Sequence, residues 1–402
     1  MKANTLKLCL PVIAITVQNN VPSLIIPPFL QQLQFPVATI GSLISLSPIL
    51  ALASRVPMGM AYKKSRARML MSIGIVAMAV SNFLYSHAGN ALAFALVHGI
   101  NGFAFGAVTT LYMAFYVDSL PPDENRNHAM GYYVGCLAAG YSIGSFVAGY
   151  VADRFGYAVT FYVAALLSFF CLVLIWFAGG TSTRDSAKQE RIAPPTLRLG
   201  DLFKAALEPE MAGVIVVALF LNIIHQMGNV FLPLYGLAVG LTLTQVGVIR
   251  AFYSLCNAIT RPLSGFVVNR FGHRRLSYGG MPLQSGIMML VPAFTDFGTL
   301  LALYIAAGFM RAVALVSNAV GLVQDIDETK VPRGATSGLY NAAGDLGSIL
   351  GPSMGGLIAS FTGIAGLFVV APVGSTALFI GAMWILKVTR KTEGCVSATE
   401  EA

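Results

Sequence analysis

The sequence is a succession of apolar stretches, each long enough to cross a lipid bilayer, which takes about 20 residues in a helix. Of its 402 residues, 56% are apolar and only 10% are charged, against about 25% charged residues in soluble domains. Hydrocarbon tolerates only a backbone whose hydrogen bonds are satisfied within the segment, so these stretches predict helices. We therefore predict an all-α integral membrane protein, embedded in the lipid bilayer, with about twelve transmembrane helices. The predicted spans are 7–30, 37–61, 69–88, 91–117, 128–151, 156–179, 211–239, 243–267, 276–295, 298–323, 334–360 and 364–387.

Basic residues are distributed unevenly between the two faces that this topology implies. They gather near both ends of the chain and in the even-numbered connections, for example at 63–68 and 270–275, whereas the opposite face carries only Asp153, Arg154 and Asp296. Basic connections stay in the cytoplasm, so we predict cytoplasmic termini and a location in the cytoplasmic (inner) membrane. The net charge of +8 therefore reflects membrane topology and does not indicate a nucleic-acid partner.

The second half of the chain repeats the first at an offset of 206 to 207 residues. Arg55 and Gly59 align with Arg261 and Gly265 at this offset. Further aligned pairs are Gly41 with Gly247, Gly140 with Gly347, Gly144 with Gly351, and Gly149 with Gly356. Glycine and charged residues fix backbone shape and close packing, so these coincidences predict two six-helix halves facing a central cavity. The predicted segments are 1–179, the cytoplasmic linker 180–208, 209–390 and the cytoplasmic tail 391–402.

One stretch carries a family resemblance. Arg261-Pro-Leu-Ser-Gly-Phe-Val-Val-Asn-Arg-Phe-Gly-His-Arg-Arg275 resembles the signature between spans 8 and 9 of the major facilitator superfamily, with Asn269 where that family usually has aspartate. The first-half counterpart has Lys63 at the acidic position. The resemblance covers essentially the whole chain and implies a transporter of twelve spans. It implies a role in conformational change for Gly59, Arg68, Gly265, Arg270, Gly272 and Arg274.

A glycine-rich stretch in span 11 is similar to a motif of the proton-coupled antiporters, or exporters, of that superfamily. It contains Gly347, Gly351, Pro352, Gly355 and Gly356, and a weaker copy lies in span 5, where the family usually places the motif. Small residues three or four apart form a smooth strip on one helix face, which allows close helix contact. We expect either a seam along which helices rock or a strip that only packs tightly.

Three charged residues lie near mid-depth in the second half. At about 1.5 Å per residue, Arg250, Arg311 and Asp345 come to similar depths in spans 8, 10 and 11. Two arginines and one aspartate leave a positive surplus, which favours an anionic or zwitterionic substrate because guanidinium groups bind carboxylates in a two-pronged geometry. Asp345 is our candidate for the proton-coupling group, since ionisable residues inside membranes are functional by default. The alternative is a permanent Asp345–Arg311 ion pair that leaves Arg250 alone as a ligand.

Polar residues at helical spacing extend this predicted cavity to both halves. In the first half these residues are asparagines and a tyrosine. In the second half they are asparagine and glutamine side chains together with a histidine. A lone histidine is more often a hydrogen-bonding residue than a proton shuttle, and both readings stay open. The predicted substrate ligands besides the arginines are Asn19, Asn20, Asn101, Tyr112, His225, Gln226, Asn229 and Asn341.

Four further charges recur at the cytoplasmic ends of spans 4 and 10. Asp118 and Arg126 align with Asp325 and Arg333. The repetition predicts a gate or latch on that face, and ordinary solvated loop charge is the alternative.

These features favour a secondary active transporter over an enzyme or a receptor. No nucleophile elbow, zinc-protease motif or phosphate-binding glycine loop is present, and we expect neither a cofactor nor a metal. We predict proton-coupled export of a small carboxylate-bearing compound, such as a metabolite, siderophore or amphiphilic drug, by a protein that functions as a monomer. Proton symport that imports an organic anion or other nutrient is the alternative.

Overall fold

The protein is a bundle of α-helices throughout the residues that its computed structural model describes, which are 3–120, 126–177, 206, 208–324 and 333–400. Ten α-helices occur in these ranges, together with two 3-10 turns, Tyr85–His87 and Val291–Ala293, and no strand. The α-helices are α1 (Ala3–Gln32), α2 (Val37–Ala61), α3 (Lys64–Leu84), α4 (Ala91–Asp118), α5 (Arg126–Phe177), α7 (Pro209–Ala238), α8 (Leu243–Phe271), α9 (His273–Met289), α10 (Phe297–Gln324) and α11 (Arg333–Glu400).

Two of these helices each contain two spans. The backbone of α5 leaves the helical conformation at Gly156, with φ of 80°, and that of α11 does so at Gly363, with φ of 75°. Glycine suits these corners because residues with a Cβ rarely adopt positive φ. Ten helices with two such corners provide the twelve segments of the predicted fold, which is confirmed. The predicted linker 180–208 lies largely outside the described residues, so the domain boundaries remain a prediction.

The ninth segment is shorter than the sequence predicted. The helix α9 ends at Met289, and a 3-10 turn containing Pro292 replaces the rest of the expected span 276–295. Proline has no backbone N–H to continue a helical ladder, so an apolar run alone overestimated this helix.

Eight of the helices are long and apolar enough to cross a membrane, while α8 and α9 do not meet that criterion. In α8 the polar residues lie inside the protein: Arg250 and Asn257 are buried, whereas Phe252, Ile259 and Leu263 are exposed. The helix thus presents an apolar face outward and a polar face inward, which is expected of a helix beside an internal cavity.

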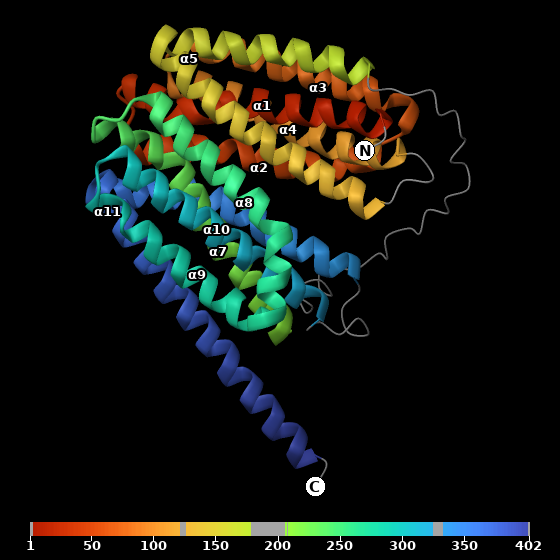
Figure 1. Ribbon diagram of the computed structural model, residues 1–402, viewed down its shortest axis with the longest axis vertical. Coiled ribbons are helices and arrows are strands. Elements are labelled where there is room, and N and C mark those ends of the chain that lie inside the picture. The colour runs from red at the N-terminus through yellow and green to blue at the C-terminus, as the bar shows by residue number, and fades with distance from the viewer. Residues whose placement is uncertain (1–2, 121–125, 178–205, 207, 325–332, 401–402) are drawn as a thin grey trace.

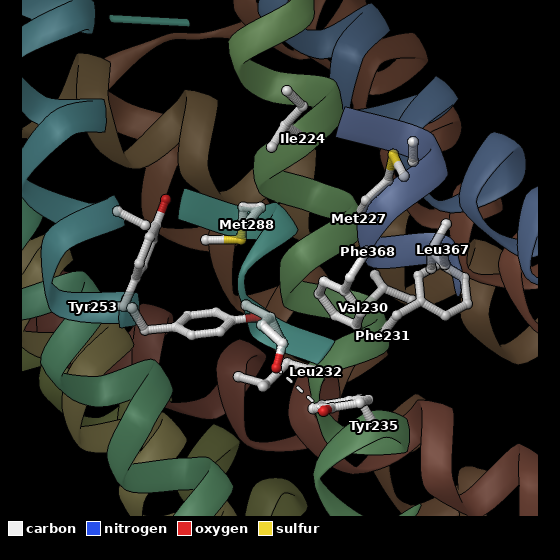
Figure 2. Close-up of a cluster of buried hydrophobic side chains, with 14 of the residues drawn as sticks. Ile224, Met227, Val230, Phe231, Leu232, Tyr235, Tyr253, Met288, Leu367 and Phe368 are labelled. Atoms are coloured by element: carbon white, nitrogen blue, oxygen red, sulfur yellow. Dashed lines mark hydrogen bonds between the residues drawn. The ribbon is translucent and has the colours of Figure 1, made fainter. Parts of the chain in front are cut away.

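The helices form two bundles, with α1 to α5 in one and α7 to α11 in the other (Figure 1). Each bundle has its own apolar core. In the second half, Met227 and Phe231 of α7 lie beside Leu367 and Phe368 of α11, and Tyr253 extends from α8 on the opposite side (Figure 2).

The glycine-rich strip of α11 packs mainly inside its own half. A Cβ at Gly347 would lie 2.6 Å from Asn222 Cβ and 2.7 Å from the Leu219 carbonyl oxygen, both in α7. A Cβ at Gly351 would lie 2.8 Å from the carbonyl oxygen of Ile223. The corresponding glycines of α5 face α1 in the same way. The strip therefore packs α11 closely against α7.

Other glycines of the repeat bring the two halves together. A Cβ at Gly41 of α2 would lie 2.9 Å from Gly356 Cα of α11, and a Cβ at Gly247 of α8 would lie 3.3 Å from Gly149 Cα of α5. Gly41 aligns with Gly247 and Gly149 with Gly356 in the sequence repeat. The halves thus meet through two pseudo-equivalent seams, α2–α11 and α8–α5.

Replacing Gly347 with alanine is expected to destabilise the protein by about 1–3 kcal/mol, because the new methyl group has to displace α7 backbone. Gly374, another glycine of α11, provides the control: a Cβ there meets nothing within 4 Å, and alanine favours helix over glycine. Thermal unfolding in detergent should give a lower Tm for Gly347→Ala and an equal or higher Tm for Gly374→Ala. Equal Tm values for Gly347→Ala and the parent would contradict the packing described here.

Candidate functional site

Arg250 of α8 joins the two halves in the first two turns of that helix. Its side chain is buried, and its Nη2 atom lies 3.4 Å from Asn20 Oδ1 and 3.4 Å from Ser23 Oγ, both in α1. Its Nη1 atom is buried and donates to no residue that the structure describes. A buried guanidinium with an unused donor is costly unless an acceptor reaches it. Arg250 is therefore the strongest candidate ligand among the predicted residues.

Asn20 is fixed by the helix that neighbours it. Its Nδ2 donates to the carbonyl oxygen of Tyr141 at 2.6 Å and to Ser145 Oγ at 2.7 Å, both in α5. These bonds turn the side-chain oxygen of Asn20 toward Arg250. The prediction from helical spacing thus placed Asn20 and Arg250 correctly on inward faces, and the structure shows that they face each other.

Arg311 of α10 has a different environment. Its Nη1 donates to the carbonyl oxygen of Leu221 at 2.6 Å, and its Nη2 donates to Asn222 Oδ1 at 2.8 Å. Both acceptors lie in α7, so Arg311 ties two helices of one half together. The ion pair with Asp345 that the sequence offered as an alternative does not form, because α7 supplies the acceptors of Arg311 and Asp345 has another partner.

That partner is Arg55 of α2, in the other half of the protein. Arg55 Nη1 and Asp345 Oδ2 form an ion pair across the α2–α11 seam. The Arg55 side chain is 42% exposed and that of Asp345 is 21% exposed, so neither is fully enclosed by the protein. Sequence reasoning considered the charges of the second half only and missed Arg55, although the alignment of Arg55 with Arg261 was visible in the repeat.

His225, Tyr253 and Asn229 form a compact polar group between α7 and α8. The hydroxyl of Tyr253 lies 2.8 Å from His225 Nδ1, and the two rings stack with centroids 5.3 Å apart. Asn229 Nδ2 lies 3.0 Å from His225 Nε2 and 3.5 Å from Gln226 Oε1. His225 is engaged on both ring nitrogens, which agrees with the hydrogen-bonding reading of this residue.

Tyr304 of α10 adjoins this polar group beside Tyr253. Its ring lies 6.1 Å from that of Tyr253, and its buried hydroxyl has no partner among the described residues. Tyr304 also lies within electrostatic range of Arg250. Sequence reasoning missed it, although Arg311 lies two helical turns away on the same face of α10.

Two predicted ligands face the interior of the first bundle. Asn101 donates to Asn82 Oδ1 of α3 at 3.3 Å, and the hydroxyl of Tyr112 donates to the carbonyl oxygen of Leu8 at 2.7 Å. Both side chains are buried in these contacts. Periodicity located their helix face correctly but did not show which neighbour that face meets.

Asn19 is half-buried and Asn341 is exposed, and neither side chain has a hydrogen bond to another described residue. The residues of the family signature lie at the turns. Gly272 has φ of 83° and ends α8, Arg270 lies over the ring of Phe271, and Arg274 is in the first turn of α9. Gly59 and Gly265 make no close approach to another helix, and Arg68 lies 5.6 Å from the ring of Phe115.

The predicted gate residue Asp118 makes its contacts within the first half. Its Oδ2 accepts from the hydroxyl of Tyr62 at 2.8 Å, and its carbonyl oxygen accepts from Lys64 Nζ at 2.8 Å. Burial, together with this hydrogen bond and the charge of Asp118, raises the pKa of Tyr62 above its ordinary value. Asp118 thus links α4 to the connection between α2 and α3. The side chains of Arg126, Asp325 and Arg333 lie outside the described residues.

An acidic residue links the halves at the end of the bundle that holds residues 33–36, 153–157 and 239–242, which we call the short-connection end. Asp153 Oδ1 accepts from the backbone N–H of Leu243 at 2.8 Å, and its Oδ2 accepts from that of Thr244 at 2.6 Å. The carboxylate of α5 therefore caps the N-terminus of α8 across the seam, where the helix dipole favours negative charge.

Serine hydroxyls add to both seams. Ser45 of α2 donates to the carbonyl oxygen of Ile349 in α11 at 2.7 Å, and Ser142 of α5 donates to that of Ala251 in α8 at 3.0 Å. These four residues occupy pseudo-equivalent positions with the donor exchanged between partners. The bonds of the seams thus run along the helices from the short-connection end, where Asp153 lies, to the Arg55–Asp345 pair.

Comparison with known proteins identifies this architecture. The family model described as Major Facilitator Superfamily matches residues 8–249 and 226–402. The chain therefore belongs to the major facilitator superfamily of membrane transporters. An uncharacterised MFS-type transporter of Methanocaldococcus jannaschii is 20% identical over 337 residues, covering 84% of this chain and 86% of its own length.

Solved structures share the fold at low sequence identity. The nucleoside transporter NupG is 17% identical with a TM-score of 0.77, and the match covers 96% of this chain and 99% of that one. A bacterial homologue of the human lysosomal transporter Spinster, in an inward-facing and occupied conformation, is 13% identical with a TM-score of 0.75, covering 95% and 94%. At such identities the likeness concerns the fold.

Replacing Asp153 with asparagine should loosen the short-connection end, because the amide can accept only one of the two N–H bonds and carries no charge. We expect a several-fold larger population with that end open, from a loss of about 1 kcal/mol. Spin labels at Gln32 and Ala238, in a background without other cysteines, would report the separation of the two halves by pulsed EPR.

The matched control for this measurement is Asp296→Asn. Asp296 caps the backbone N–H of Thr299 at 2.7 Å inside its own half, so its replacement should leave the label distances unchanged. An identical distance distribution for Asp153→Asn and the parent would show that the Asp153 cap does not hold the halves together.

Proposed function

We propose that this transporter exports a small carboxylate-bearing compound, anionic or zwitterionic, in exchange for protons. The observation that carries the proposal is the buried Nη1 of Arg250, which lacks an acceptor among the described residues at the point where the two halves meet. A carboxylate is the natural acceptor there, because it forms charge-assisted bonds with a guanidinium.

The charges of the predicted substrate site support an anion. The Arg55–Asp345 pair is neutral overall, and Arg311 is held by acceptors in α7. Arg250 keeps a full positive charge with only two long contacts, to Asn20 and Ser23. A lipophilic cation would meet repulsion here, whereas an anion would complete the hydrogen bonds of a buried charge.

The position of Arg250 links binding to conformational change. A substrate bound to Arg250 on α8 and to Asn20 on α1 would contact both halves, so its affinity would depend on their relative orientation. Alternating access requires such a dependence, since one half moves against the other around the bound compound. Tyr304 would add a hydroxyl on the side of the second half.

Proton coupling would use Asp345. Protonation of this carboxyl group removes its charge and therefore breaks the ion pair with Arg55, which joins α2 to α11 across the seam. The link between the halves would thus be weaker in the protonated state. The coupling free energy would come from the different affinity of Asp345 for the proton in the two conformations.

The direction of transport rests on the glycine motif, which is similar to that of exporters. Import of an organic anion by proton symport is the second candidate, because the same arginine and aspartate would serve it. The fold likeness to a nucleoside transporter makes nucleosides the neutral compounds to include in a test. We further propose a monomer in the cytoplasmic membrane, with both termini in the cytoplasm.

Arg250→Gln should weaken the binding of a transported anion by roughly 10- to 100-fold, the loss of one or two charge-assisted bonds. Purified protein in proteoliposomes would be tested for uptake and counterflow of salicylate, citrate, uridine and tetraphenylphosphonium. Arg154→Gln, which removes an exposed charge at the short-connection end, is the control and should transport like the parent. Transport of tetraphenylphosphonium or uridine alone would refute the anion proposal.

Asp345→Asn should abolish proton movement driven by the transported anion while preserving its binding within a few-fold. The neutral amide resembles the protonated acid but cannot exchange a proton. A pH-sensitive dye inside the vesicles would measure the flux, and isothermal titration calorimetry would measure binding. Asp296→Asn, which alters an exposed carboxylate, should leave the flux intact. Undiminished flux in Asp345→Asn would make Asp345 a structural residue.

A further inference from the structure

At the position of the Arg55–Asp345 ion pair, the two seams between the halves differ in one charge. On the α2–α11 seam, Arg55 of α2 is paired with Asp345 of α11. At the offset of the sequence repeat, Arg55 corresponds to Arg261 of α8, and Asp345 corresponds to Ala138 of α5. The α8–α5 seam therefore keeps the arginine and lacks the carboxylate.

The correspondence between the seams is structural as well as sequential. Gly41 meets Gly356 on one seam, as Gly247 meets Gly149 on the other. The serine hydroxyls of the two seams bind carbonyl oxygens at equivalent positions. The region beside Ala138 is thus the counterpart of the place that the Asp345 side chain occupies.

Arg261 faces the interior of the protein. It lies on the same face of α8 as Arg250 and Asn257, and it is half-buried, whereas the opposite face carries the exposed Ile259 and Leu263. Its Nε donates to Asn257 Oδ1 within the same helix at 3.1 Å. Among the residues that the structure describes, no carboxylate contacts Arg261 and no acceptor binds its two terminal nitrogens.

The surroundings of Arg261 make binding of an anion more favourable. Arg311 lies within electrostatic range and carries the same charge. The hydrogen bond from Arg261 to Asn257 satisfies only one of five N–H donors. A partly buried cation beside another cation attracts any mobile anion that reaches it.

We propose that Arg261 is a second anion-binding position for the substrate, where the carboxylate of the substrate takes the place that Asp345 fills on the other seam. This inference rests on the proposed transport of a carboxylate-bearing compound. Arg250 and Arg261 are eleven residues apart on α8, about 16 Å along the helix axis, so a small compound occupies the two positions in succession. A carboxylate at Arg261 balances the charge of that arginine as Asp345 balances the charge of Arg55.

Ala138→Asp tests this position by supplying the missing carboxylate from the protein itself. The new aspartate pairs with Arg261 and competes with the substrate, so the Kd for salicylate or citrate should rise about 10-fold or more in isothermal titration calorimetry. Ala138→Asn has nearly the same size without the charge, and its Kd should stay within two-fold of the parent.

Arg261→Gln is the second variant, in case a carboxylate at position 138 prevents folding. It should also raise the Kd about 10-fold and reduce the dependence of the Kd on salt concentration, because one cation no longer contributes. Arg154→Gln, with an equal charge change at the short-connection end, should leave the Kd unchanged. Size-exclusion chromatography would verify that each variant is monodisperse.

The outcomes separate this inference from the proposed function. If Arg250→Gln abolishes anion binding while Ala138→Asp and Arg261→Gln both bind within two-fold of the parent, Arg261 is not a substrate position and the anion transporter stands. If the parent binds neither salicylate nor citrate, both proposals are wrong. A raised Kd in both Arg261→Gln and Ala138→Asp, with unchanged Ala138→Asn, establishes the second position.

Discussion

The architecture depends on backbone-to-backbone contact between the two halves at paired glycines. Gly41 against Gly356 and Gly149 against Gly247 let helices from different halves approach more closely than any side chain would allow. At these glycines the contact surface is smooth, and the polar bonds described across each seam are specific. Each of them, a carboxylate cap, an ion pair or a serine hydroxyl, can break without disturbing the packing inside a half.

The contacts within each half therefore differ in kind from the contacts between the halves. Within each half, the strip of Gly347 and Gly351 on α7, the arginine of α10 and the apolar core make contacts that involve fixed backbone. Between the halves, the polar contacts described depend largely on side chains, such as those of the Arg55–Asp345 pair and Ser45. Rocking of one half against the other requires that pattern, since the elements that move have to be rigid and their interface has to be reversible.

Much of the fold was predictable because each cue has a direct physical cause. Apolar length sets the spans, glycine repeats reveal the duplication, and helical spacing identifies the polar faces of α1, α7 and α8. The partners of those faces were not predictable, since periodicity gives the direction of a side chain relative to its own helix only. Asn101 and Tyr112 therefore proved to face neighbouring helices of their own bundle, and Arg311 met α7 instead of Asp345. Arg55 could have been found from the sequence repeat, because the repeat aligns it with Arg261 of the second half.

Duplication provides a symmetric frame, and function requires departures from it. The glycines and serines of the seams obey the repeat, whereas Asp345, Arg250 and Asp153 have no charged counterpart at the aligned positions. A symmetric pair of ion pairs would hold both seams equally and leave no cation for a ligand. In the proposed mechanism, omitting one carboxylate, at Ala138, and adding one arginine, at position 250, would convert a structural interface into one whose charge a bound anion completes. The cost of burying these arginines inside the membrane is then offset only while an anion is bound, so binding and closure of the interface are coupled by the same charge.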